Sequence, residues 1–199
     1  MRERIAVALV LTGLLACAAG CRKEVDRAGF ISAIDESYAG RHVCVWPEPM
    51  KLPVESDPSK DERTRAYNAL TDAGLLIREA EVKEHFVPGT VPMNKYNLSD
   101  RGHAAWTADA SRPDYGNFCF GHFNVTAIDK ATANDPSNPT QYTVIYSYEV
   151  EGIPGWARTP ESMGAFPQIA EDTSIQTGTA TLVKGANGGW AVVAGQAAN

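Results

Sequence analysis

The strongest constraint on the fold is a series of strand-like runs in the second half of the 199-residue chain. Four runs are rich in Val, Ile, Thr and Tyr, the residue types that favour β-strands. They span residues 118–127, 141–150, 174–184 and 190–194. The segment 185–189, Gly-Ala-Asn-Gly-Gly, has the composition of a tight hairpin turn. The pattern predicts an antiparallel sheet.

The first half shows helical spacing instead. Apolar residues from Val25 to Tyr38 recur at helical intervals, and Gly40 follows as a terminator. Residues 60–73 repeat this spacing, with Gly74 where glycine commonly ends a helix. A further helix is expected at 160–170, between two of the strands.

Shorter elements complete the expected layout. We predict a strand at 42–46, a loop over 47–59, strands at 75–86 and 95–98 around a turn at 87–92, and a helical turn from Ser99 through Trp106. The predicted fold class is α+β. N-terminal helices with a short two-stranded, wing-like hairpin are expected to pack on a C-terminal antiparallel sheet.

The N-terminus has the layout of an export signal. Arg2 and Arg4 precede an apolar run from Ile5 to Leu15, which is too short to cross a bilayer but fits the hydrophobic region of a signal peptide. Small residues then lead to Cys21, and polar residues follow directly. This layout resembles the bacterial lipoprotein signal, in which the cysteine is lipidated and becomes the first mature residue.

The resemblance implies a signal peptide at 1–20 and lipidation at Cys21. Cys17 is the alternative lipidated residue, and a plain secretory signal cleaved near Gly20 is a further alternative. The rest, 21–199, is then expected to be a single α+β periplasmic domain, with a helical half at about 24–112 and a sheet half at about 113–199.

The same resemblance predicts where the protein resides. Acyl chains such as palmitate would anchor it to a membrane without a transmembrane helix, and no later stretch of the sequence approaches 18 apolar residues. The residue after Cys21 is Arg rather than Asp. In bacterial lipoproteins this favours delivery to the outer membrane, so we expect a lipid-anchored protein of the bacterial cell envelope facing the periplasm.

Cys44 and Cys119 are the cysteines left in the expected folded part. Disulfides form and persist in exported domains, so a Cys44–Cys119 bridge is the favoured prediction. Two buried free thiols are an alternative. A zinc site with His42 and His122 is another, because Cys2His2 sets bind zinc. It would need a bulge at Gly121 to bring Cys119 and His122 to one face. No metal or cofactor is therefore predicted.

Residues 60–106 resemble the C-terminal half of a winged helix-turn-helix domain. The matching segments are Ala69–Leu75 and Tyr96–Gly102. The helix corresponding to the recognition helix carries both acidic and basic residues and lacks the net positive face that phosphates require. The whole chain has 18 basic and 24 acidic residues, a net charge of −6. We therefore expect a helix–strand–strand packing unit and no nucleic-acid partner.

Residues 115–192 resemble the C-terminal part of uncharacterised proteobacterial lipoproteins. The resemblance rests on Cys119–Gly121, Val144–Tyr148, Pro154–Ala157, Phe166-Pro167 and Gly189-Trp190. It supports the envelope assignment and implies no particular chemistry.

No catalytic motif of the hydrolase, zinc-protease, phosphate-loop or dinucleotide type occurs in the sequence, and no catalytic residues are predicted. The acidic residues Glu79, Glu81 and Glu84 fit the solvated face of a strand. Three tyrosines share one face of the strand at 141–150 and could pack in the core or, with a nearby tryptophan, line a shallow groove. These candidate groove residues are Tyr142, Tyr146, Tyr148 and Trp156.

The favoured function is a non-enzymatic, lipid-anchored envelope protein that binds another envelope protein or supports an assembly. One alternative is an acidic inhibitor or immunity-type protein directed against a basic envelope enzyme. Another is a cell-wall hydrolase that uses carboxylates or a Cys/His pair, for which loss of turnover in Glu81→Gln or His122→Ala would be the evidence.

Overall fold

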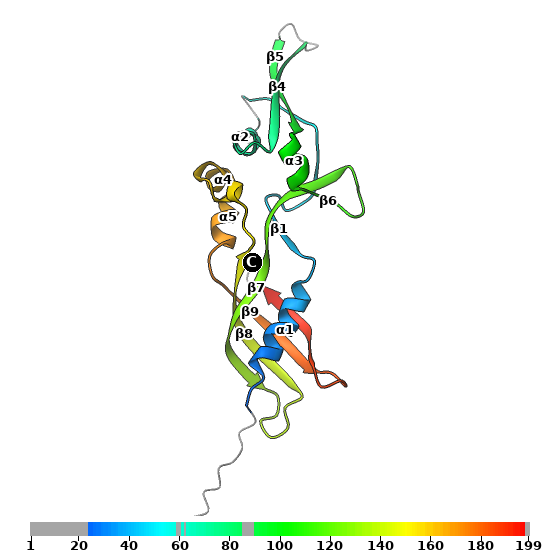
Figure 1. Cartoon of the computed structure of the whole chain (residues 1–199), viewed down its shortest axis with the longest axis vertical. Coiled ribbons are helices and arrows are strands. Elements are labelled where there is room, and N and C mark those ends of the chain that lie inside the picture. The colour runs from blue at the N-terminus through cyan, green and yellow to red at the C-terminus, as the bar shows by residue number, and fades with distance from the viewer. Residues whose placement is uncertain (1–23, 59–60, 62, 85–89, 198–199) are drawn as a thin grey trace, which may run out of the picture.

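The computed structural model describes residues 24–58, 61, 63–84 and 90–197, and its α+β fold confirms the predicted class (Figure 1). A seven-stranded and a three-stranded antiparallel sheet carry the described strands. Figure 1 shows an elongated molecule, with the β4–β5 hairpin at one end and helix α1 lying across the larger sheet toward the other. The signal region and both lipidation candidates, Cys17 and Cys21, lie outside the described residues.

The larger sheet is organised around one long strand, β7 (Tyr115–Ala133). Its main path runs β1-β7-β8-β9-β10, and two short strands, β2 and β6, also pair with β7. The other strands are β1 (His42–Cys44), β2 (Met50–Lys51), β6 (Trp106–Ala108), β8 (Gln141–Glu151), β9 (Gln176–Lys184) and β10 (Trp190–Ala197). Register shifts at two points along the β7–β8 ladder bend this sheet.

Helix α1 (Arg27–Tyr38) packs against the larger sheet. Asp26 caps its first turn by accepting a hydrogen bond from the Gly29 amide, and Gly40, at φ +77°, follows its C-terminal end. The buried side of the helix meets aromatic rings of the sheet. The Phe30 ring lies 4.9 Å from both the Tyr142 and the Trp190 rings. These contacts form the first core cluster.

A second core cluster lies between the larger sheet, the base of the smaller sheet and four further helical segments. These are α2 (Thr64–Asp72), the 3-10 turn η1 (Gly155–Arg158), α4 (Pro160–Ala165) and α5 (Pro167–Asp172). The Phe118, Phe120 and Ile169 side chains are fully buried in this cluster. Phe123 packs against both clusters and so links the two cores.

The smaller sheet has the order β3-β5-β4. Its strands are β3 (Val54–Ser56), β4 (Leu76–Glu84) and β5 (Thr90–Leu98), and α3 (Asp100–Ala105) follows β5. Ser99 caps α3 by accepting a hydrogen bond from the Gly102 amide. Tyr96 is fully buried at the base of this sheet, whereas four successive residues of β4, 77–80, are exposed.

Several predicted boundaries change. The expected loop 47–59 contains β2 and β3, because segments of only two or three residues become strands when β7 and β5 pair with them. Strand β5 already includes Val91 and Pro92, which were assigned to a turn. The wing-like hairpin therefore belongs to a three-stranded sheet. No helix among the described residues is both long and apolar enough to cross a membrane.

The helical predictions need two corrections. The helix expected at 160–170 is interrupted at Phe166, because Pro167 begins a new helix and cannot donate to the preceding turn. The helical turn expected through Trp106 ends at Ala105, since Trp106 pairs with Phe118 in β6.

Candidate binding groove beside the disulfide

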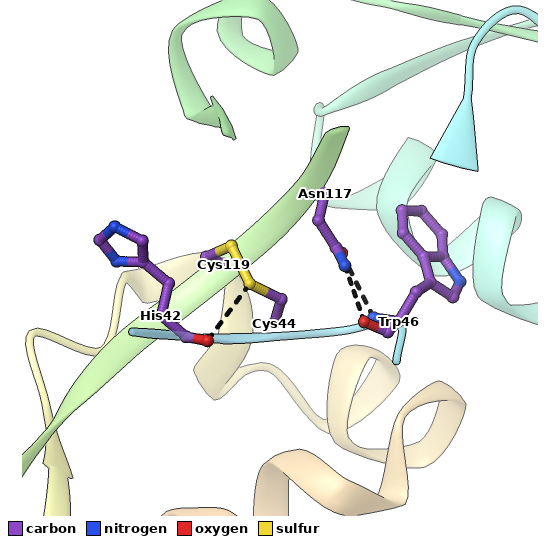
Figure 2. Close-up of a disulfide and its surroundings, with 5 residues drawn as sticks. All are labelled: His42, Cys44, Trp46, Asn117 and Cys119. Atoms are coloured by element: carbon purple, nitrogen blue, oxygen red, sulfur yellow. Dashed lines mark hydrogen bonds between the residues drawn. A yellow bond between two sulfur atoms is a disulfide. The ribbon is translucent and has the colours of Figure 1, made fainter. Parts of the chain in front are cut away.

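Cys44 and Cys119 form a disulfide with an S–S distance of 2.06 Å, which confirms the favoured prediction (Figure 2). Strands β1 and β7 are antiparallel neighbours, and their register places Cys44 directly opposite Cys119. The bridge therefore links two residues 75 positions apart in the sequence. The alternative of two free thiols is excluded in this structure.

The four residues of the alternative zinc site, the two cysteines with His42 and His122, lie on the same pair of strands. His42 lies opposite His122 in the same strand pair, and the register shifts next to the cysteines. Both sulfur atoms are bonded to each other, however, so neither is available as a thiolate ligand. Among the described residues, no group of three or more His, Cys, Asp or Glu side chains could hold a metal ion.

Asn117 fixes the chain immediately after the disulfide. Its side-chain oxygen accepts from the Trp46 amide at 3.3 Å, and its side-chain nitrogen donates to the Trp46 carbonyl at 2.7 Å (Figure 2). Asn117 is buried, and both of its bonds are made to backbone. After β1 ends, these two bonds take the place of the strand pairing with β7. They therefore hold the Trp46 backbone beside β7.

A hollow of about 520 Å³ opens beside the disulfide, and we call it the disulfide groove. Its volume falls within the range typical of small-ligand sites. Most of its lining is apolar or aromatic. The lining residues are His42, Val43, Cys44, Trp46, Pro47, Pro49, Thr107, Ala108, Asp109, Ala110, Asn117, Cys119 and Phe123.

Asp109 contributes the carboxylate of the groove. Its Oδ1 accepts from the Ser111 hydroxyl at 2.7 Å and from the Arg112 amide at 2.7 Å. The Ser111 hydrogen bond is the main reason why the pKa of Asp109 lies below its usual value. At neutral pH the Asp109 carboxylate is therefore ionised, and the Arg112 Nε lies 3.8 Å from its Oδ1, which partly compensates the negative charge. The exposed imidazole of His42 lies in the same groove.

Of the four residues that could line a groove, the three tyrosines lie together in a core cluster and Trp156 lies apart from them. Tyr142, Tyr146 and Tyr148 are buried beneath α1 in the first core cluster. Trp156 is buried in the second cluster. Their burial fits the core-packing alternative, and Tyr146 also borders a small hollow of about 210 Å³ between α1 and β10.

The acidic and histidine side chains that a hydrolase could use, including Glu81 and His122, are dispersed over the fold. Glu81 lies on β4 of the smaller sheet, where its carboxylate is 3.9 Å from the Lys95 ammonium, whereas His122 lies on β7 of the larger sheet. Asp114 pairs with Lys51 at 3.0 Å. His103 is in α3, and His85 lies outside the described residues.

Most of the groove is not predictable from local sequence patterns. Trp46, Asn117 and Asp109 come from separate segments, and their proximity depends on the pairing of β1 and β6 with β7. The one local signal was the aromatic and proline-containing segment 46–49, directly after Cys44.

A second hollow of about 600 Å³ lies between α2 and the α4–α5 junction. Arg63 and Arg65 line it together with Trp46 and Phe166. The Arg63 guanidinium is engaged by Asp61 at 3.3 Å.

Comparison with known proteins gives no match to a family model, a curated protein or a solved structure. The function therefore has to be argued from the groove and the sequence.

Proposed function

We propose that this protein is a lipid-anchored protein of the bacterial cell envelope that binds a segment of another envelope protein in the disulfide groove. The signal-like N-terminus supports export and lipidation at Cys21. The Cys44–Cys119 bridge is in keeping with an oxidising compartment. Under this proposal the protein is a binding or assembly module of the outer membrane, facing the periplasm.

The disulfide groove carries the proposal. Three features suit a short apolar protein segment: the Trp46 ring, the rigid prolines 47 and 49, and the Phe123 ring. Rigid aromatic and proline surfaces lose little conformational entropy when a ligand binds. The ionised Asp109 carboxylate, whose charge Arg112 partly compensates, adds a weaker preference for a basic residue next to the apolar one. The expected ligand is therefore a protein segment that combines an apolar and a basic side chain.

Site-specific cross-linking in intact cells tests the binding proposal. A photo-reactive amino acid at position 49, in the groove, is expected to give a discrete cross-linked species. The same amino acid at position 145, exposed on β8 of the larger sheet, is the control and should not give it. Thr107→Trp fills the groove and should abolish the species. Equal cross-linking from both positions, or persistence in Thr107→Trp, would argue against the groove.

Metabolic labelling with a fatty acid tests the anchor separately. The label should be lost in Cys21→Ser and retained in Cys17→Ser, because Cys21 ends the small-residue run and begins the polar chain. The reverse result would move the lipidation site to Cys17. Membrane fractionation by density then distinguishes outer-membrane from inner-membrane residence.

The acidic balance favours a second candidate, an inhibitor or immunity-type protein that binds a basic envelope enzyme. The net charge of the chain is −6. Electrostatic complexes of this kind weaken steeply as salt rises. A cross-linked partner that is a basic enzyme, with salt-sensitive binding and loss of its activity in the complex, would select this candidate.

A further inference from the structure

Strand β4 is an open edge. The smaller sheet has the order β3-β5-β4, so β4 pairs with β5 on one side, and no described strand pairs with its other side. Residues 77–80 are exposed, and Ile77 keeps 48 % of its surface accessible. Figure 1 places this strand in the hairpin at the end of the molecule, away from α1. A nine-residue edge of this kind is a template for another strand.

Edge strands are often protected by charges of one sign, which repel a second copy. The residues of β4 from 78 to 84 are Arg-Glu-Ala-Glu-Val-Lys-Glu, in which both signs occur. The order of the signs matters for pairing with an identical strand. When two copies of this segment run antiparallel and are aligned at Glu81, each positive residue of one copy lies opposite a negative residue of the other.

We propose that β4 pairs antiparallel with β4 of a second copy of this chain, about a two-fold axis at Glu81. In such a pair the two-fold axis is perpendicular to the sheet and passes beside one residue of the strand. That residue lies opposite the same residue of the second copy. With Glu81 at that position, Arg78 lies opposite Glu84 of the partner subunit. Glu79 then lies opposite Lys83 of the partner subunit, and symmetry repeats each pairing.

The centre of this register also fits. Ala80 lies opposite Val82 of the partner subunit, which places two apolar residue types together on both sides of the axis. Glu81 meets its own copy, and this is the one like-charge pair. The Lys95 ammonium, 3.9 Å from the Glu81 carboxylate on the neighbouring strand, offsets that repulsion.

Neighbouring registers are poorer. A shift of the axis to Ala80 would bring Glu79 opposite the partner's Glu81 twice, without an opposite-charge pair. A shift to Val82 would bring Glu81 opposite the partner's Lys83 twice, but it would place Glu84 opposite the partner's Ala80. It would thus give two opposite-charge pairings, against four in the register centred on Glu81. Charge complementarity therefore selects the register centred on Glu81. This inference is independent of the proposed function.

Measurement of the oligomeric state tests the interface. Sedimentation of the purified protein over a range of concentrations should show a monomer–dimer equilibrium. Glu84→Lys turns both Arg78–Glu84 pairings repulsive and should weaken the dimer about ten-fold. The double variant Arg78→Glu/Glu84→Lys restores opposite charges and should recover it. A monomer at every concentration, or no effect of Glu84→Lys, would refute the proposal.

Glu149→Lys is the matched control, because it makes the same charge change on β8 of the other sheet. Either change makes the net charge of −6 two units less negative, so nonspecific repulsion between copies would fall in both variants. Nonspecific electrostatics therefore predict a tighter dimer for both. Only the proposed register predicts a weaker dimer for Glu84→Lys and no weakening for Glu149→Lys.

Cysteine cross-linking tests the register. Glu81→Cys places two cysteines at the axis and should give a disulfide-linked dimer under mild oxidation. Glu79→Cys is the control, because its two copies are separated by four residues, about 13 Å along the strands. Wild-type protein measured in parallel gives the background from its own cysteines. Equal linkage of both variants, or linkage of Glu79→Cys alone, would overturn the proposed register.

Discussion

The larger and smaller sheets are both antiparallel, but they use their faces differently. In β8 of the larger sheet, burial alternates along the strand, and its inward residues lie beneath α1. In β4 of the smaller sheet, four consecutive residues are exposed, and burial is concentrated at the base, where Leu76 and Tyr96 meet α2. The first sheet is covered by its own chain, whereas much of the second is left in contact with solvent.

The larger sheet thus contributes mainly to folding stability, whereas β4 of the smaller sheet offers exposed surface to partners. Burial of aromatic rings contributes most to the stability of the α1-covered sheet. Charged side chains dominate β4, and exposed ion pairs contribute little to folding. Substitutions in the two regions should therefore separate stability from association.

The largest expected contrast is between a core ring and an exposed side chain on β4. Phe30 is fully buried between α1 and the sheet, so Phe30→Ala should lower the free energy of unfolding by about 3–5 kcal/mol. Ile77→Ala on β4 should change it by less than about 0.5 kcal/mol. Denaturant unfolding measures both values. Similar losses in the two variants would remove the distinction between the two sheets.

Loss of the disulfide should have the next largest effect. The bridge closes a long loop between β1 and β7, so the double variant Cys44→Ala/Cys119→Ala should lose about 2–4 kcal/mol. Each kcal/mol lowers the melting temperature of a domain of this size by about 2–4 °C. Calorimetry with and without reductant checks this. Unchanged melting of the wild-type protein after verified reduction would contradict the prediction.

A smaller loss is expected from Gly178→Ala. A Cβ at Gly178 would overlap the Tyr146 ring beneath α1, so this variant should cost about 1–3 kcal/mol. Gly164→Ala in α4 is the control, because no atom lies within 4 Å of the added Cβ. Alanine also favours the helix, so the control should be neutral or slightly stabilising. Equal thermal shifts for the two variants would show that the packing at Tyr146 is loose.

The smallest expected effect is a loss of folding stability at high pH, over the first pH unit above 10. Desolvation, followed by the hydrogen bond with Tyr38, raises the pKa of Tyr146 above its ordinary value of 10.0. The unfolded chain therefore ionises first, so this stabilisation is complete below about pH 10 and is lost as pH rises further. The slope is about 1.4 kcal/mol per pH unit for one tyrosine.

The matched variant is Tyr146→Phe. It should be less stable than wild type near neutral pH, because Tyr38 loses a hydrogen-bond partner, and it should show a shallower decline of stability at alkaline pH. Denaturant unfolding at a series of pH values measures both slopes. Identical slopes would assign the alkaline sensitivity to other groups.

Elements with strong local patterns were predicted well. The helix at 27–38, the strand at 141–151 and the hairpin of β9 and β10 follow from periodicity and turn residues. The short strands β2 and β3 were missed, because their pairing with β7 and β5 defines them rather than their own composition. The length of β7 was underestimated for the same reason, since several partners extend its ladder beyond the apolar run.

The sequence by itself determined the α+β class, the main helices and strands, and the pair of cysteines in the folded part, because periodicity and composition act over a few neighbouring residues. Only the tertiary structure decided that Tyr142, Tyr146 and Tyr148 face a helix rather than a ligand. It also decided that Trp46, Asp109 and the disulfide share a groove. These arrangements join segments far apart in the chain, and which strands pair is set by the free energy of the whole fold rather than by any local pattern.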